Sequence, residues 1–168
     1  MNAFGKIIGI LIATIIFFFV PIFVLAQRQE LMIESYVLTK TAYLVEHIRS
    51  NGYVSKEMYE RYQRQLAQTG YLYTIEMEHQ TALYDKDESE DRYQKQYQST
   101  YEEDILKVLF GEEGIYFMKK GDFFFLKVAS KTRGIADKMK SYFGIPTYSI
   151  PVIQVELGGM VRDEMDGL

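Results

Sequence analysis

The chain opens with an uninterrupted stretch of apolar side chains. From Ile7 to Ala26 the sequence reads IIGILIATIIFFFVPIFVLA, which is 20 residues without a charged side chain. A helix rises about 1.5 Å per residue, so this stretch reaches across the roughly 30 Å hydrocarbon layer of a bilayer. We therefore predict that residues 1–26 form a transmembrane or leader segment and that every folded part of the chain follows it.

Three interpretations of this segment stay open. It is a retained membrane anchor, a signal peptide cut after Ala26, or a short leader cut between Gly5 and Lys6 that leaves the apolar helix in place. The length favours the anchor, because the apolar region of a signal peptide usually has only about 7 to 15 residues. We expect the amino terminus in the cytoplasm and a helix kink at Pro21, whose ring removes one backbone hydrogen bond.

The helical pattern continues beyond the apolar run, as an amphipathic extension over residues 27–50. Four apolar side chains recur there at steps of seven and three and form what we call the stripe: Leu31, Leu38, Val45 and Ile48. We expect one helix from about residue 4 to residue 50, roughly 70 Å long, that stops at Asn51-Gly52. Because such a helix outreaches a small domain, we predict that the first two stripe positions face partners and the last two are buried.

The remaining residues, 51–168, are called the head below, and they mix helical and strand patterns. Ser55 offers an N-cap for an amphipathic helix that Gly70 ends. Residues 71–79, YLYTIEMEH, alternate in polarity as a half-buried strand does. Residues 80–100 concentrate charge and lack apolar periodicity, which predicts a long loop or an excursion at the surface.

The second half of the head continues this mixture. Thr100 and Glu103 have the spacing of a capping box for a short helix. Residues 115–118 and 122–129 are expected to pair as a hairpin. A helix over 131–143 and a terminal edge strand, begun by Pro146 and Pro151, complete the pattern. The predicted fold class is α+β, with the long amino-terminal helix packed on a small, mainly antiparallel four-stranded sheet with short helices.

Composition and charge narrow the classes of partner. Hydrophobic residues make up 48% of the 168 residues, which is enough to build a core. The net charge is −4, so there is no basic excess to neutralise a phosphate backbone, and we expect neither nucleic acid nor an anionic lipid surface to attract the head. The chain has no cysteine, which excludes a disulfide framework, a thiolate zinc site and a thiol nucleophile.

The polar residues do not form a recognisable catalytic pattern. His47 and His79 lack a second histidine at metal-ligand spacing, so we interpret both as structural or surface residues. Asp85, Asp87, Ser89 and Asp91 alternate like the start of a calcium loop, but Glu90 and Gln96 replace the required Gly and Glu, which favours a solvated acidic loop. We therefore expect no catalytic residue, no metal and no cofactor, and a protein that is not an enzyme.

The layout of the chain resembles that of type IV pilins and pseudopilins, and is most similar to TadE-like components of Tad (Flp) pilus systems. The similarity lies in the apolar helix with its proline, the amphipathic extension and the small sheet, and in two stretches, Asn51 to His79 and Gly158 to Glu164. It implies a membrane-held subunit or assembly factor of an extracytoplasmic pilus or secretion filament. Its partners would be lipid, other pilin-like or secretion-platform proteins, and further copies of the chain.

One departure from the pilin pattern refines this expectation. If the chain were cut after Gly5, the position at which pilins usually carry a glutamate would be Ile10. A glutamate in a membrane helix is costly unless it is paired, so its absence favours an accessory or minor subunit over the main pilin. A second hypothesis, from another class, is a membrane-tethered extracytoplasmic domain that binds or senses a ligand through a Tyr-rich surface and works with a membrane partner.

Overall fold

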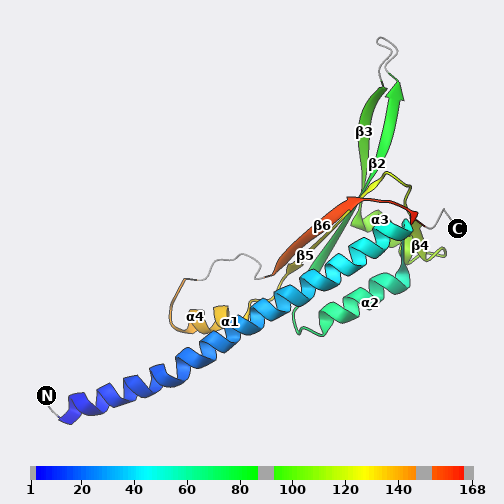
Figure 1. The fold of residues 1–168 in the computed structure, drawn as a ribbon. Helices are drawn as coiled ribbons and strands as arrows, with labels where there is room; N and C mark the ends of the chain where they lie inside the picture. The colour runs from blue at the N-terminus through cyan, green and yellow to red at the C-terminus, as the bar shows by residue number, and fades with distance from the viewer. Residues whose placement is uncertain (1–2, 87–92, 147–152, 165–168) are drawn as a thin grey trace.

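One long helix organises the molecule. In the computed structural model, which describes residues 3–86, 93–146 and 153–164, helix α1 runs from Ala3 to Asn51 without a break. Its first turns project away from the rest of the chain, α4 lies beside its middle, and its second half lies along the head (Figure 1). Gly52 ends the helix in the left-handed conformation, with φ at 74°, and its N–H donates to the Ile48 carbonyl at 2.9 Å.

The head has an α+β fold, as the sequence predicted. In the described residues, α1 is followed by β1 (Tyr53–Ser55), α2 (Lys56–Ala67), β2 (Tyr73–Lys86), β3 (Tyr93–Tyr101), α3 (Glu102–Leu109), β4 (Ile115–Phe117), β5 (Phe123–Ser130), α4 (Ile135–Tyr142) and β6 (Gln154–Met160). Helix α2 begins where the sequence predicted, because the Ser55 hydroxyl accepts the Met58 N–H at 3.3 Å.

Four strands form the main sheet, in the order β3-β2-β5-β6, and all its neighbours are antiparallel. Strand β5 lies at the centre of the packed part and alternates strictly, with Phe124, Leu126 and Val128 buried on one face. Strand β6 lies at an edge, as expected for a strand preceded by prolines. β1 and β4 form a separate two-stranded sheet.

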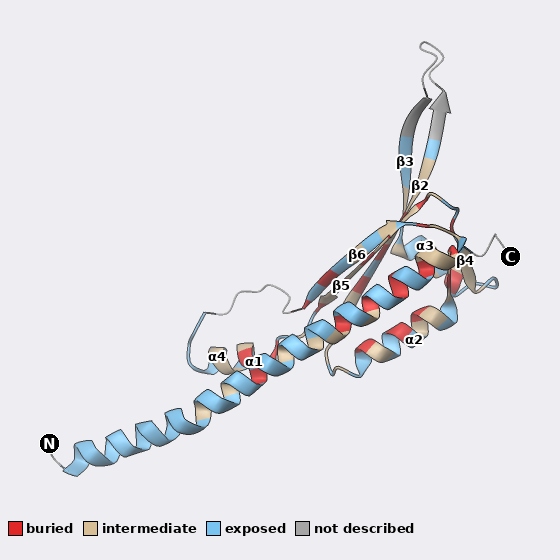
Figure 2. Cartoon of the chain, viewed as in Figure 1, coloured by how far each residue is buried: buried red, intermediate tan, exposed pale blue. Residues whose placement is uncertain are grey.

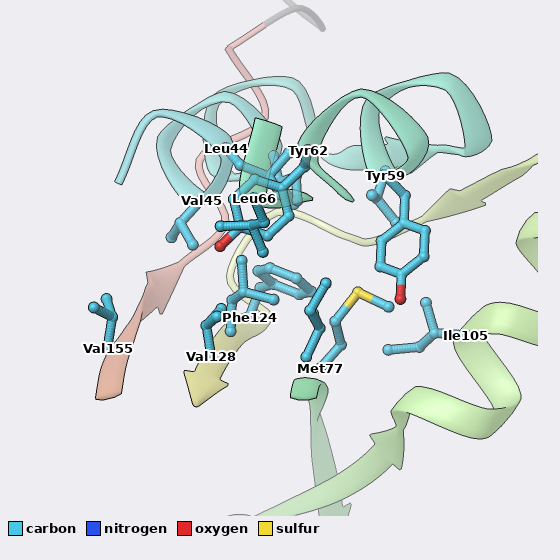
Figure 3. Close-up of a cluster of buried hydrophobic side chains, with 14 of the residues drawn as sticks. Leu44, Val45, Tyr59, Tyr62, Leu66, Met77, Ile105, Phe124, Val128 and Val155 are labelled. Atoms are coloured by element: carbon cyan, nitrogen blue, oxygen red, sulfur yellow. The ribbon is translucent and has the colours of Figure 1, made fainter. Parts of the chain in front are cut away.

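The core lies between this sheet and a layer of two helices. Leu44 and Val45 of α1 and Tyr62 and Leu66 of α2 point toward the buried face of the sheet (Figure 3). The buried part of α1 extends back to Val37, which is fully buried. Residues 51–168 therefore do not close their own core, and the last turns of α1 supply one of its walls.

A loop over residues 80–100 is wrong, whereas the alternative, an excursion at the surface, agrees with the projecting arm that β2 and β3 form. β2 continues to Lys86, and β3 pairs with it from Tyr93 to Tyr101. This arm extends beyond the helices that cover the rest of the sheet (Figure 1). Side chains at Leu83 and at residues 96–98 are exposed, so these parts of the strands do not need the alternation of apolar and polar residues that a half-buried strand shows. Residues 87–91 of the calcium-like pattern lie outside the described residues.

The predicted hairpin between residues 115–118 and 122–129 is also wrong. The chain does turn there, with the Asp122 N–H donating to the Lys119 carbonyl at 3.0 Å. However, β5 is already paired on both sides, by β2 and β6, so β4 pairs with β1 instead, placing Tyr116 opposite Val54. The local sequence predicted that both segments are strands. Which strands pair with each other depends on the other strands that compete for the same edges.

The predicted capping box does not form. Helix α3 begins after Tyr101 and has no side-chain hydrogen bond at its N-cap. Thr100 is the last residue but one of β3, opposite His79 in the ladder. The Thr100 side chain is hydrogen-bonded to Tyr116, so it does not cap the helix.

The helix predicted over residues 131–143 is shorter than expected. It corresponds to α4, which starts at Ile135 and ends at Tyr142.

A buried tyrosine makes the core sensitive to alkali. The Tyr62 hydroxyl lies 2.6 Å from Thr41 Oγ1, and burial raises the pKa of Tyr62 to about 12 from its ordinary 10.0. Since the folded state favours the neutral phenol, this contribution to stability is complete below pH 10 and disappears as the pH rises through about 12. Phenylalanine has no hydroxyl to ionise. Between pH 10 and pH 12 we therefore expect the free energy of unfolding of Tyr62→Phe to fall by about 2 kcal/mol less than that of the wild type.

Urea unfolding of the full chain in detergent at a series of pH values measures this effect. Tyr43→Phe is the matched control, because Tyr43 is 71% exposed on the same helix pair. The control should retain the wild-type slope between pH 10 and pH 12. Equal slopes for wild type and Tyr62→Phe would contradict the assignment of this alkaline sensitivity to Tyr62.

Candidate functional site

The exposed face of α1 is the most prominent surface of the molecule. Within the part of the chain that the structure describes, α1 is the one helix that is long and apolar enough to cross a membrane. The most apolar 18 residues of α1 contain no buried residue. Figure 2 shows the contrast, with the first half of α1 almost entirely exposed and buried residues concentrated in its second half. An exposed apolar helix of this length is compatible with a membrane anchor or with a signal sequence.

The stripe divides into two exposed and two buried positions. Leu31 is 64% exposed and Leu38 is 46% exposed, whereas Val45 is 4% exposed and Ile48 is fully buried. The division follows from helix geometry, because a seven-residue step falls about 20° short of two full turns. The stripe therefore winds from the free side of α1 at Leu31 to the core side at Val45.

The candidate site is a packing surface, which we call the outer patch: Leu31 and Leu38. Met32 is also exposed, at 70%, but it lies about 100° around the helix from Leu31 and borders another hollow, with Tyr36, Gln68 and Thr69. The polar residues 27–30 separate the outer patch from the exposed apolar run of α1.

The predicted cleavage and kink positions all lie in that exposed half. Gly5 and Lys6 are exposed in the first turns of α1, and a side chain at Gly5 would meet nothing within 4 Å. Pro21 lies inside the helix, which continues through it. Ile10, at the position of the pilin glutamate, is 68% exposed.

The carboxy-terminal stretch Gly158 to Glu164 holds the end of α1. Arg49 of α1 donates from Nε to the Met160 carbonyl at 3.0 Å, and the Arg162 N–H donates to the Arg49 carbonyl at 2.7 Å. Arg162 also pairs with Glu46 and donates to Ser50 Oγ at 2.8 Å. A β-carbon at Gly159 would lie 2.8 Å from the Arg49 guanidinium carbon, so this glycine makes room for the contact. The stretch fixes the direction in which α1 leaves the head.

A buried histidine connects three segments of the head. His79 on β2 is 5% exposed; its Nε2 lies 3.0 Å from Asp122 Oδ2 and its Nδ1 lies 2.8 Å from the Tyr116 hydroxyl. The Asp122 carboxylate also accepts the Lys119 N–H at 2.8 Å. A neutral imidazole that donates from Nε2 to Asp122 and accepts at Nδ1 from Tyr116 satisfies every one of these contacts.

This network is arranged for stability rather than for nucleophilic catalysis. Thr81 Oγ1 approaches the same nitrogen of His79 that contacts Asp122, at 3.4 Å, whereas a catalytic base uses opposite nitrogens for the nucleophile and the carboxylate. Burial raises the pKa of the Tyr116 hydroxyl, which opposes its ionisation. The sequence did contain a signal for this site, because His79 continues the buried alternation of Ile75 and Met77.

A groove between α1 and α2 is the second candidate site. Its cavity has a volume of about 90 Å³ and is lined by Lys40, Tyr43, Leu44, His47, Met58, Arg61, Tyr62 and Gln65. His47 is exposed at its edge, and Arg61 pairs with Glu57 at 2.7 Å. Two aromatic rings and two cationic side chains suit an anionic or aromatic ligand. In the described residues no group of three or more His, Asp or Glu is placed to hold a metal ion.

Comparison with known proteins adds no relative to this description. No family model, no curated protein and no solved structure matches the chain.

Proposed function

We propose that this chain is a membrane-anchored, pilin-like minor subunit or assembly factor of a Tad or type IV pilus, or of a related secretion machine. Its amino terminus lies in the cytoplasm, α1 crosses the membrane, and the head lies outside the cell membrane. The chain acts by packing its helix and its surface against other subunits, and performs no chemistry of its own.

The observation that carries this proposal is the division of α1 into three zones. The first half is apolar and exposed, the middle carries the outer patch, and the end is buried in the head. An anchor alone accounts for the first zone but leaves the outer patch without a role. A helix that continues from lipid into contact with neighbouring subunits accounts for both.

A membrane-tethered binding or sensing domain is the alternative function. The groove between α1 and α2 supports it, because the groove adjoins the same helix that leads into the membrane. In this alternative a ligand would contact Tyr43 and Lys40, and the outer patch would contact a membrane partner that transmits the signal.

Site-specific cross-linking tests the proposed function. The natural chain has no cysteine, so Leu31→Cys introduces a single thiol in the outer patch. We expect a reagent with a maleimide at one end and a photoactivatable diazirine at the other to join it, in membranes from cells that assemble the machine, to pilin-like or secretion-platform proteins that mass spectrometry identifies. Phe117→Cys is the control, because Phe117 is 70% exposed on β4, at the other end of the head.

The same two variants also test the orientation. A maleimide that does not cross membranes should label Phe117→Cys in intact spheroplasts if the head lies outside. Labelling only after lysis would reverse the proposed topology. Adducts formed equally from both positions, or adducts with no pilus or secretion component, would contradict the assembly role.

A further inference from the structure

Helix α4 lies against the end of the apolar run of α1, far from it in sequence. The Phe143 ring, directly after α4, contacts the Phe19 ring with 4.4 Å between the centroids. Lys140 Nζ lies 5.9 Å from the centre of the Phe23 ring. Ala136 of α4 is 1% exposed and Ala26 of α1 is 6% exposed. The contact is therefore close, and small residues at Ala26 and Ala136 lie buried beside it.

A charged residue fixes the position of α4. Glu30 Oε1 accepts the Ala136 N–H at 2.9 Å, at the amino-terminal end of α4, where a carboxylate also stabilises the helix dipole. Gly134 makes this approach possible, because a β-carbon there would lie 1.9 Å from Glu30 Oε1. The helix is thus held at a definite height along α1.

The outer side of this segment is apolar and basic. Four large apolar residues between 131 and 146 are exposed: Ile135 at 47%, Tyr142 at 87%, Phe143 at 57% and Ile145 at 52%. The same segment contains Lys131, Arg133, Lys138 and Lys140 against the single acid Asp137. Its charge is therefore opposite in sign to the net charge of −4 of the whole chain. Aromatic and basic side chains together are typical of elements that lie in the interface of a bilayer.

The height of the contact points to lipid as the occupant of this surface. Phe19 lies seven residues before Ala26, the end of the uncharged run, and therefore about 10 Å along the helix inside it. If the run spans the bilayer, Phe143 lies at the depth of the outer acyl chains, and the basic side chains of the segment lie near the headgroups. At that depth the four exposed apolar side chains of residues 131–146 would contact acyl chains and not water.

We propose that residues 131–146 form a second membrane contact, in which Tyr142, Phe143 and Ile145 enter the outer leaflet and Lys131, Arg133 and Lys138 face anionic headgroups. This inference rests on the proposed membrane anchor. With α1 and α4 both held by the bilayer, and α4 fixed to α1 through Glu30, the head keeps one tilt and one rotation relative to the membrane. The outer patch of α1 is then presented to neighbouring subunits in one orientation.

Depth measurements on the full chain in vesicles test this proposal. Single cysteines replace Tyr142, Phe17 and Tyr43, carry an environment-sensitive dye, and are reconstituted in phosphatidylcholine vesicles containing phosphatidylglycerol. We expect the dye at position 142 to be quenched by iodide about fivefold less than the dye at position 43, and to be quenched by lipids with a label near the headgroup. The dye at position 17 should respond only to deeply placed labels.

The three positions separate failure of the inference from failure of the anchor. A dye at position 17 that iodide reaches would overturn the anchor itself. A buried dye at position 17 combined with an iodide-accessible dye at position 142 would overturn only the second contact. Protection at position 142 that disappears on diluting the protein in lipid would show that a second copy, and not lipid, covers the segment.

Charge reversal tests the headgroup contact. Arg133→Glu with Lys138→Glu should raise iodide quenching at position 142 in vesicles with phosphatidylglycerol, while Lys119→Glu with Lys120→Glu, two exposed lysines elsewhere on the head, should leave it unchanged. If iodide quenching at position 142 stays unchanged in both charge-reversal variants and in vesicles without phosphatidylglycerol, anionic lipid has no role in the contact.

Discussion

Val45→Asp combined with Ile48→Asp is expected to abolish cooperative unfolding of the head. Both side chains are buried, at 4% and 0% exposure, between the sheet and α2. Each substitution removes about 2 kcal/mol of apolar burial and places a carboxylate without a partner in the core. The combined cost of more than about 5 kcal/mol is comparable with the whole stability of a domain of this size.

Leu31→Asp combined with Leu38→Asp is the matched pair, with the same chemistry on the same helix. Both side chains are largely exposed, so we expect the free energy of unfolding to change by less than about 1 kcal/mol. Circular dichroism of the full chain in detergent, followed during heating, measures both pairs. The Leu31 and Leu38 variant should instead lose co-purification with its machine. Equal melting defects in the two pairs would remove the outer patch as an argument for a partner.

His79→Ala is expected to destabilise the head by about 3 kcal/mol. The substitution removes the imidazole that contacts both Asp122 and Tyr116, and leaves a carboxylate that is 4% exposed with one partner fewer. The loss extends across the head, because the network joins β2, β4 and the turn before β5. Urea unfolding at pH 7 measures the change in free energy.

Two further variants make this test specific. Tyr116→Phe deletes only one hydroxyl and should cost about 1 kcal/mol. His47→Ala removes an exposed histidine from α1 and should change stability by less than about 0.5 kcal/mol. If His79→Ala costs no more than His47→Ala, the buried network does not hold the two sheets together.

Helix periodicity in the sequence predicted part of the outer patch of α1. The spacing of Leu31, Leu38, Val45 and Ile48 located the stripe, and the length of the helix indicated that part of it would be uncovered. The structure places the boundary of burial between Leu38 and Val45. Val37, one residue before Leu38, is fully buried, so the boundary depends on which face of α1 the sheet and α2 cover, and the spacing along one helix does not give that face.

The contacts that define the other sites join residues far apart in the chain. His79 and Asp122 are separated by 43 positions, and Glu30 and Ala136 by 106. Each of these residues has an ordinary local environment in the sequence: His79 lies in an alternating strand, Asp122 in a turn, and Glu30 and Ala136 in helices. The local pattern around each residue does not indicate which distant residue it will contact, and a single sequence gives no other information about these contacts.

Local patterns in the sequence determined the extent of α1, the N-cap of α2 at Ser55, the alternation of β5 and the α+β class, because each depends on neighbours within a few residues. Tertiary structure alone decided that β4 pairs with β1, that residues 80–86 and 93–100 form strands, and that α4 lies against Phe19 and Phe23. Strand pairing and helix docking are competitions among distant segments for the same edges and faces. Their outcome is set by the total burial and hydrogen bonding of the whole fold, which no short window of the chain records.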